Sequence, residues 1–165
     1  MTREEYIACV QEYSDMVFKI AFSYFGSKAD AEDVMQDVFL KVLRGSSLPE
    51  REDDLKAWLI RITVNRCHSI FRSPFRRRAE WMTDYEWGNL PEPGSMEDKV
   101  ATKQTVYQAV MRLPAKYRLV VHLYYYEDMQ VKDIAKTLGI KETTAQTRLA
   151  RARKMLKRDL KDLSE

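Results

Sequence analysis

The sequence predicts an all-α protein made of two small helical domains joined by a flexible linker, with a helix-turn-helix in the C-terminal domain. Three observations predict this fold class. Apolar residues recur at spacings of three and four along the N-terminal part, a segment with prolines, glycines and aromatic residues follows, and a basic amphipathic segment lies near the C-terminal end. Of the 165 residues, 45% are hydrophobic, which is enough to bury two small cores. We expect a first domain over residues 1–72, a linker over 73–98 and a second domain over 99–165.

The N-terminal domain is expected to contain three helices. The first carries one apolar stripe that ends before Gly26, and its members are Tyr6, Val10, Tyr13, Val17, Ile20 and Tyr24. A second helix over Asp30–Leu43 turns polar side chains outward, namely Glu32, Asp33, Gln36 and Asp37. Asp53 and Asp54 favour the start of a third helix, because the unpaired N–H groups of a first turn attract negative charge.

The third predicted helix carries a polar stripe beside its apolar side. The apolar residues expected to face the core are Leu55, Trp58, Leu59, Ile62 and Ile70. The polar residues follow spacings of 4, 3 and 4 and so share one face, and they are Arg61, Asn65, His68 and Arg72. Such a stripe is compatible with a binding surface and equally with an ordinary solvated helix face. The periodicity alone leaves both interpretations open.

The segment from Tyr126 to Leu156 predicts two short helices crossed at a glycine turn. The apolar side of the first helix consists of Val131, Ile134, Ala135 and Leu138. Gly139 is expected to end this helix, because glycine adopts a left-handed backbone without a Cβ clash. Ala135 supplies the small side chain that two helices need where their axes cross, and the second helix would pack through Ala145 and Leu149.

The other face of this second helix carries short polar and guanidinium side chains, the kind that contact base edges and phosphates in a major groove. The candidate DNA-contacting residues are Thr143, Thr144, Gln146, Thr147, Arg148, Arg151 and Arg153. Residues 141–158 contain seven Lys or Arg and one acidic residue, so basic charge is concentrated here. The alternative is a solvated face of an amphipathic helix, but the turn glycine and the small crossing residue favour DNA binding.

Charge is unevenly distributed along the chain, although the net charge is only +3. Residues 1–60 contain 7 basic and 12 acidic side chains, whereas residues 101–165 contain 14 and 7. A second basic block covers residues 61–82, and residues 83–100 are acidic. Two basic blocks predict two regions that contact nucleic acid, and the acidic surface is left for a protein partner.

The cysteine, histidine and glycine content argues against several other classes of protein. Cys9 and Cys67 lie far apart in a sequence without an apolar leader, so we expect no disulfide framework and a reducing cytoplasm. Two histidines provide no metal ligand set, and none of the five glycines lies in a phosphate-binding loop. We therefore expect a cytoplasmic protein that is not an enzyme, has no catalytic residues, needs no cofactor or metal and does not insert into a membrane.

Three stretches of the sequence carry a resemblance to a known family. They are DAEDVMQDVFLKVL (Asp30–Leu43), LKAWLIRITVNRCHSIFR (Leu55–Arg72) and LPAKYRLVVHLYYYEDMQVKDIAKTLGIKETTAQTRLARARKML (Leu113–Leu156). Many helix-turn-helix regulators share the third stretch, but the three in this order and spacing are specific. The chain resembles the bacterial extracytoplasmic-function (ECF) sigma factors of RNA polymerase, which belong to the sigma-70 family, and the likeness spans nearly the whole sequence.

The resemblance implies a role for each candidate set. In this family the helix that matches Asp30–Leu43 docks on a coiled coil of RNA polymerase, which implies polymerase binding by Glu32, Asp33, Gln36 and Asp37. The stretch that matches Leu55–Arg72 contacts the opened downstream promoter element, which implies this role for Arg61, Asn65, His68 and Arg72. The helix-turn-helix would contact the upstream element as duplex. The implied partners are RNA polymerase core, promoter DNA and an anti-sigma factor, and the free protein is expected to be a monomer.

The sequence departs from the family pattern in three places. Residues 48–51 stand where the family often has an aromatic-basic-glycine run, so promoter preference in this loop is not transferable. Gln130 and Lys141 stand where better helix caps are usual. The alternative function is an operator-binding helix-turn-helix transcription regulator that does not join RNA polymerase. Such regulators usually dimerise on paired half-sites, and no heptad seam is evident in this chain.

Overall fold

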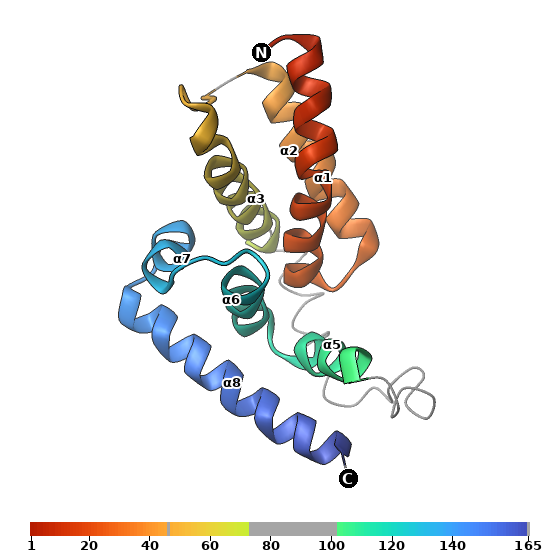
Figure 1. Cartoon of the computed structure of the whole chain (residues 1–165), viewed down its shortest axis with the longest axis vertical. Helices are drawn as coiled ribbons and strands as arrows, with labels where there is room; N and C mark the ends of the chain where they lie inside the picture. Colours follow the sequence, from red (N-terminus) through yellow and green to blue (C-terminus); the bar gives the residue numbers. More distant parts are fainter. Residues whose placement is uncertain (46, 73–101, 165) are drawn as a thin grey trace. The chain divides into compact units, whose positions relative to one another are not determined.

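The computed structural model describes residues 1–45, 47–72 and 102–164, and these residues form helices and short connections without a β-strand (Figure 1). In chain order the elements are α1 (Arg3–Phe25), α2 (Lys28–Arg44), the 3₁₀ helix η1 (Glu52–Asp54), α3 (Leu55–Phe71), α5 (Thr102–Arg112), α6 (Ala115–Tyr125), α7 (Val131–Leu138) and α8 (Glu142–Ser164). The predicted all-α fold class is confirmed. The linker predicted over residues 73–98 lies outside the described residues.

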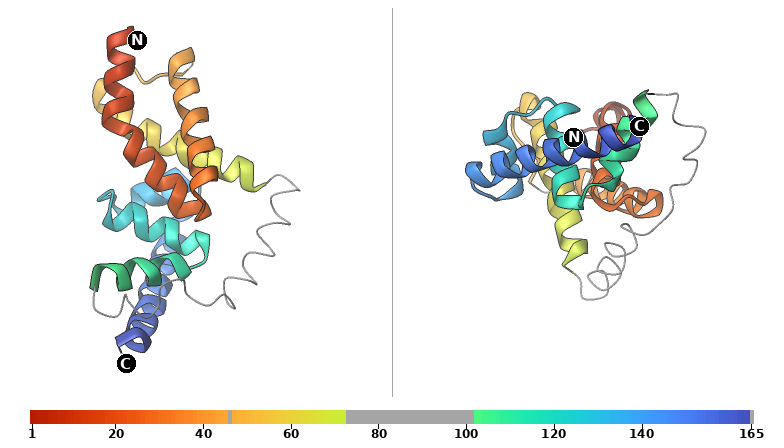
Figure 2. Two further views of the ribbon diagram at one scale, coloured as in Figure 1. Left: turned by 90° about the vertical axis from the view of Figure 1, so that its right-hand side faces the viewer. Right: turned by 90° about the horizontal axis from the view of Figure 1, so that it is seen from below.

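The chain divides into two compact units, residues 1–71 with 137–139 and residues 72–136 with 140–165. The first unit contains α1, α2 and α3, and each of these three helices packs against the other two. In the second unit, α8 packs against both α5 and α6. At 23 residues, α8 is the longest helix of the second unit, as Figures 1 and 2 also show.

The first unit begins with a capped helix and a tight turn. At the start of α1, the Thr2 and Glu5 side chains each accept a hydrogen bond from the other residue's backbone N–H, which forms a capping box. The helix ends at Gly26, whose φ of 66° is left-handed and therefore suits glycine. The Ser27 hydroxyl accepts from the Asp30 N–H at 3.3 Å and caps α2. This short connection accounts for the direct packing of α1 on α2.

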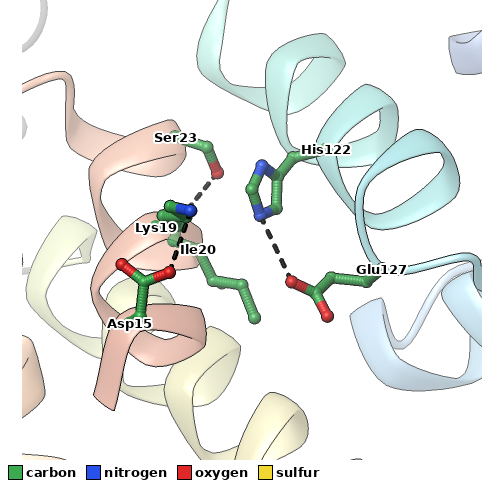
Figure 3. Close-up of polar contacts among 6 residues, drawn as sticks. All are labelled: Asp15, Lys19, Ile20, Ser23, His122 and Glu127. Carbon is green, nitrogen blue, oxygen red and sulfur yellow. Dashed lines mark hydrogen bonds and ion pairs between the residues drawn. The ribbon is translucent and has the colours of Figure 1, made fainter. Parts of the chain in front are cut away.

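The core of the first unit is wider than the sequence pattern predicts. Among the fully buried side chains are Val17, Ile20, Val34, Val42, Leu59, Thr63, Val64 and Cys67. Of the predicted α1 stripe, the C-terminal half is buried, but Tyr6, Val10 and Tyr13 are only half-buried. Leu55 and Ile70 of α3 are also only half-buried. On its solvent side, Lys19 of α1 pairs with Asp15 at 2.8 Å (Figure 3).

Among the described residues of the second unit, one guanidinium and one imidazole are buried among apolar side chains. Arg118 is 4% exposed, and its Nη1 donates to the backbone oxygens of Met111 and Leu113 at 3.1 Å each. These bonds offset the desolvation of the guanidinium and hold the end of α5 against α6. His122 of α6 is buried, and its Nε2 lies 3.8 Å from Oε1 of Glu127 (Figure 3).

Two further properties concern the whole of the described chain. Both cysteines are buried free thiols, and burial raises the pKa of Cys67 to about 12, so its thiolate is strongly disfavoured. Within residues 1–45, 47–72 and 102–164, no helix has both the length and the apolar character that a bilayer crossing requires.

Candidate nucleic-acid interface

The predicted glycine turn between α7 and α8 is confirmed in detail. Gly139 has a φ of +67°, and the Ile140 N–H donates to the Ala135 oxygen at 3.0 Å, the bond expected of a Schellman motif. A Cβ placed on Gly139 would meet no atom within 4 Å, so the backbone conformation, and not crowding, selects glycine here. The turn ends α7, and α8 begins after the three residues 139–141.

Two alanines and one leucine form the buried side of α8. Ala145, Leu149 and Ala152 are buried at spacings of 4 and 3, and Ile134 and Ala135 are buried on α7. The predicted apolar sides of both helices are therefore confirmed, except that Val131 is half-buried. Small side chains at this seam let α8 lie close to its neighbours.

The opposite face of α8 carries the predicted recognition residues. Thr143, Gln146, Thr147, Arg151 and Arg153 are exposed, and Thr144 and Arg148 are half-buried. Thr143, Thr147 and Arg151 follow one another at intervals of four residues and therefore lie along one line of the helix surface. The Thr147 hydroxyl donates to the Thr143 oxygen at 2.9 Å, so its proton is used within the helix and its methyl group and lone pairs remain for an outside partner.

Arg153 has a more specific environment than the other exposed cations of α8. Its Nε donates to the Tyr125 hydroxyl at 2.8 Å, and its guanidinium carbon lies 5.2 Å from the ring centroid of Tyr124 and 5.7 Å from that of Tyr125. The hydrogen bond with Tyr125 raises the pKa of Arg153 above its usual value, while burial acts in the opposite direction. Cation–π contacts at exposed sites contribute about 0.5–1 kcal/mol. The sequence pattern did not indicate this cluster.

The predicted polar stripe of α3 is exposed at three of its four positions. Arg61, Asn65 and Arg72 are exposed, and Arg72 follows the last residue of the helix. His68 is half-buried, and its ring meets the ring of Tyr24 edge to face, with centroids 5.6 Å apart. The stripe therefore consists of an exposed row, which is Arg61, Asn65 and Arg72, and of His68, which packs against α1.

The outward face of α2 contains a pair that the sequence did not reveal. Glu32, Asp33 and Gln36 are exposed, as predicted. Asp37 is half-buried, and its Oδ2 accepts from Nε of Arg66 on α3 at 2.8 Å. The two residues are 29 positions apart, so no local spacing pattern indicates the contact.

An apolar groove lies between α1 and α2, next to this polar face. It has a volume of about 390 Å³ and is lined by Tyr6, Val10, Ser14, Met35, Gln36, Phe39 and Leu40. Gln36 thus belongs both to the groove and to the predicted docking set. Leu40 and Leu43 of α2 are 47% and 61% exposed and lie on one face of the helix, so they extend the apolar surface beside the groove.

The described residues therefore define an all-helical class of protein, with a helix-turn-helix over α7 and α8 and an exposed polar and apolar face on α2. Comparison with known proteins identifies the family. Residues 9–78 match Sigma-70 region 2, and residues 103–156 match Sigma-70, region 4. The chain belongs to the sigma-70 family, within the ECF group, and is a sigma factor of transcription initiation.

Relatives match this chain over nearly its full length. RNA polymerase sigma factor SigV of Bacillus subtilis (strain 168) is 26% identical over 165 residues, which are 99% of this chain and 96% of that protein. ECF RNA polymerase sigma factor SigW of the same strain is 26% identical over 167 residues, which are 93% of this chain and 88% of that protein. The solved structure of sigma factor RpoE with anti-sigma factor NepR from Bartonella quintana has a TM-score of 0.68 at 22% identity and covers 96% of this chain and 98% of that chain. This last likeness supports the fold.

Proposed function

We propose that this sigma factor uses three separate surfaces in promoter-specific initiation. The exposed face of α2 binds RNA polymerase core, the α3 stripe contacts the opened downstream element, and α8 recognises the upstream element as duplex. The observation that carries the proposal is the α7–Gly139–α8 geometry, in which a buried small-residue seam supports an exposed face of polar and basic residues.

Upstream recognition is assigned to the exposed face of α8. Arg151 and Gln146 carry donors that match base edges in a major groove, and Arg paired with guanine provides roughly 1–3 kcal/mol of discrimination. Thr143, Thr144, Thr147 and Arg148 are further members of the predicted set, and its remaining member, Arg153, contacts Tyr124 and Tyr125. Since the Thr147 proton is already donated to Thr143, we expect Thr147 to accept a hydrogen bond or to contact a thymine methyl group.

Downstream recognition is assigned to the exposed row of α3. Removing a base from the stack costs a few kcal/mol, and this cost is offset when protein groups hold the base and its backbone. Arg61 and Asn65 are exposed on adjacent turns and supply a cation and an amide, while Arg72 supplies a cation for phosphate. His68 belongs to the same set, but it is half-buried and its ring packs against Tyr24, so its contribution is expected to be smaller.

Polymerase docking is assigned to α2 and the apolar groove beside it. Asp33, Gln36, Leu40 and Leu43 follow spacings of 3, 4 and 3 and are all exposed, which combines polar and apolar contacts on one face. Glu32 lies beside them, 4.0 Å from Lys28. Asp37 completes the docking set, and a partner cation there must compete with Arg66. An apolar centre with a polar rim is the usual composition of a protein interface.

The family also suggests a regulatory partner and a location. We propose that an anti-sigma factor covers the polymerase-binding face of this chain, and that both proteins meet in the cytoplasm. RpoE of Bartonella quintana is bound to an anti-sigma factor in its solved structure. The free chain is proposed to be a monomer, and no catalytic step, metal or cofactor is assigned to it.

The test is run-off transcription with purified RNA polymerase core on a linear pool of the source organism's upstream regions, with and without this protein. New discrete start sites that depend on the protein are expected and would identify its promoter. Unchanged transcription together with specific, dimeric DNA binding in a shift assay would contradict the proposal. That result would favour the operator-binding regulator instead.

A further inference from the structure

The tyrosines at the end of α6 hold a cation from the middle of α8. Tyr124 and Tyr125 meet edge to face, with ring centroids 4.9 Å apart and an interplanar angle of 79°. The guanidinium of Arg153 lies within 6 Å of both centroids and donates to the Tyr125 hydroxyl. The side chain is thus fixed by a directional hydrogen bond and by two rings of different orientation.

The Arg153 contact supplies a directional interaction to α8, whose other buried contacts are apolar and have no fixed direction. The buried seam of α8 consists of Ala145, Leu149 and Ala152, and its two alanines offer few atoms that resist rotation of the helix about its axis. Leu149 is the one large side chain of this seam, and its apolar contacts have no fixed direction. A rotation of about 20° moves a side-chain tip that lies about 6 Å from the axis by about 2 Å. Contacts with base edges need positions accurate to about 0.5 Å. Arg153 lies only two residues beyond Arg151, so it is well placed to fix this rotation.

We infer that Arg153 is a positioning residue for upstream-element recognition: clamped by Tyr124 and Tyr125, it sets the rotation of α8 and does not act as a DNA contact. The inference rests on the proposed role of α8 in binding the upstream element. It assigns the exposed Tyr125 a part in promoter specificity, although this residue lies on α6 and outside the recognition helix.

A phosphate contact by Arg153 is the competing role, and it has a different signature. Loss of a phosphate contact weakens binding to all DNA sequences alike and lowers the salt dependence of log K by about 1. Loss of a positioning contact lowers the preference for the correct element and leaves the salt dependence unchanged. Lysine keeps the charge for a phosphate but lacks the planar guanidinium, so Arg153→Lys separates the two roles.

The experiment uses holoenzyme assembled from RNA polymerase core and the full-length variants. Its affinity is measured at several salt concentrations for two linear promoter fragments, one with the upstream element intact and one with that element scrambled. The promoter is the one identified by run-off transcription. Arg153→Lys and Tyr125→Phe are the test variants. Lys154→Ala removes a neighbouring exposed charge, and Tyr126→Phe removes a hydroxyl from the neighbouring exposed tyrosine, so these two serve as matched controls.

We expect Arg153→Lys to lower the preference for the intact element about tenfold and Tyr125→Phe to lower it about threefold, both without a change in salt dependence. Tyr126→Phe should show the same preference as the unsubstituted chain. Lys154→Ala should weaken binding to both fragments equally. Full preference in Arg153→Lys, or no effect of Tyr125→Phe, would overturn the inference. If the unsubstituted chain itself shows no preference, the proposed upstream recognition fails instead. Circular dichroism and core affinity, measured for every variant, identify losses caused by misfolding.

Discussion

The two helices proposed to contact promoter DNA, α3 and α8, differ in how much of their surface is buried. Seven residues of α3 are buried, which are Trp58, Leu59, Ile60, Ile62, Thr63, Val64 and Cys67. On α8, which is six residues longer, the buried set is Ala145, Leu149 and Ala152 among the residues whose side chains the structure describes. The exposed surface left for DNA is therefore narrow on α3 and broad on α8.

The exposed surfaces of α3 and α8 are therefore supported by different kinds of packing. On α3 the exposed row stands directly on the core of a three-helix unit, so any shift of the helix disturbs both folding and binding. On α8 the exposed face is supported by a thin seam of small residues and by the Arg153 cluster. We therefore expect substitutions of the buried residues of α3 to affect stability and function together, and substitutions on the exposed face of α8 to affect DNA preference alone.

The largest expected effect is on the core beneath α3. Leu59 is fully buried, so Leu59→Ala should lower the free energy of unfolding of the first unit by about 2–5 kcal/mol, through lost apolar burial and a cavity. Hydrogen exchange of α1 to α3 amides measures this unit separately from the second. Asn65→Ala, on the exposed row of the same helix, is the control and should change stability by less than about 0.5 kcal/mol. Equal losses in both variants would show that the exposed row is structural.

The next effect concerns the exposed face of α8. Arg151→Ala should remove about 1–3 kcal/mol of discrimination for the upstream element, because a bidentate contact with a base is lost. The unfolding free energy and the affinity for RNA polymerase core should stay unchanged, since Arg151 is exposed. Competition between intact and scrambled promoter fragments measures the discrimination. A parallel loss of core affinity would mean that Arg151 does not act on DNA alone.

Charge reversal on α2 is expected to have a smaller effect, which is on the affinity for RNA polymerase core. Asp33→Arg should weaken binding to RNA polymerase core about tenfold, because it places a cation where a complementary cation of the partner is proposed to dock. Titration of the labelled chain with core polymerase, at two salt concentrations, measures this change. Glu12→Arg, an equal charge reversal at an exposed position of α1, is the control. If both reversals have the same effect, the change reflects net charge and not a docking face.

The smallest expected effect concerns the pair between α2 and α3. Asp37→Asn should lower the stability of the first unit by less than about 1 kcal/mol, because the 2.8 Å ion pair with Arg66 is partly exposed, with side-chain exposures of 40% and 44%. Hydrogen exchange of the α3 amides at increasing urea concentrations measures this change in stability. High salt should reduce the difference from the unsubstituted chain, since screening weakens the pair. A loss comparable to that of Leu59→Ala would make the ion pair a main support of α3.

Local sequence patterns predicted the helices and the turn well. The 3.6-residue periodicity predicted the apolar sides of α7 and α8, and the need for a left-handed backbone predicted Gly139. These signals were sufficient because the interactions that decide them lie within a few residues along the chain. Chain order and helical pattern also carried the family resemblance, which the matches to Sigma-70 region 2 and region 4 confirm.

Local sequence patterns did not predict contacts between residues that are distant in the sequence. The Asp37–Arg66 pair and the Arg153–Tyr125 bond join residues 29 and 28 positions apart, and no periodicity relates them. Spacing also predicted α1 as one continuous apolar stripe, whereas its N-terminal half lines a groove and is only half-buried. Burial on α3 extends to Thr63 and Val64 because the helix packs against two neighbours, which a single-stripe pattern does not anticipate.

The alanine-rich seam of α8 has a consequence for how promoter preference can change over generations. Residues that hold the helix in place and residues that face outward occupy separate sides, so a substitution on the outward side leaves packing intact. A duplicated gene encoding such a chain could acquire a new set of target promoters through codon changes at the exposed positions Thr143, Gln146, Thr147 and Arg151, without a compensating change elsewhere. One polymerase could in this way transcribe a second set of genes, while the folding stability of the sigma factor stays unchanged.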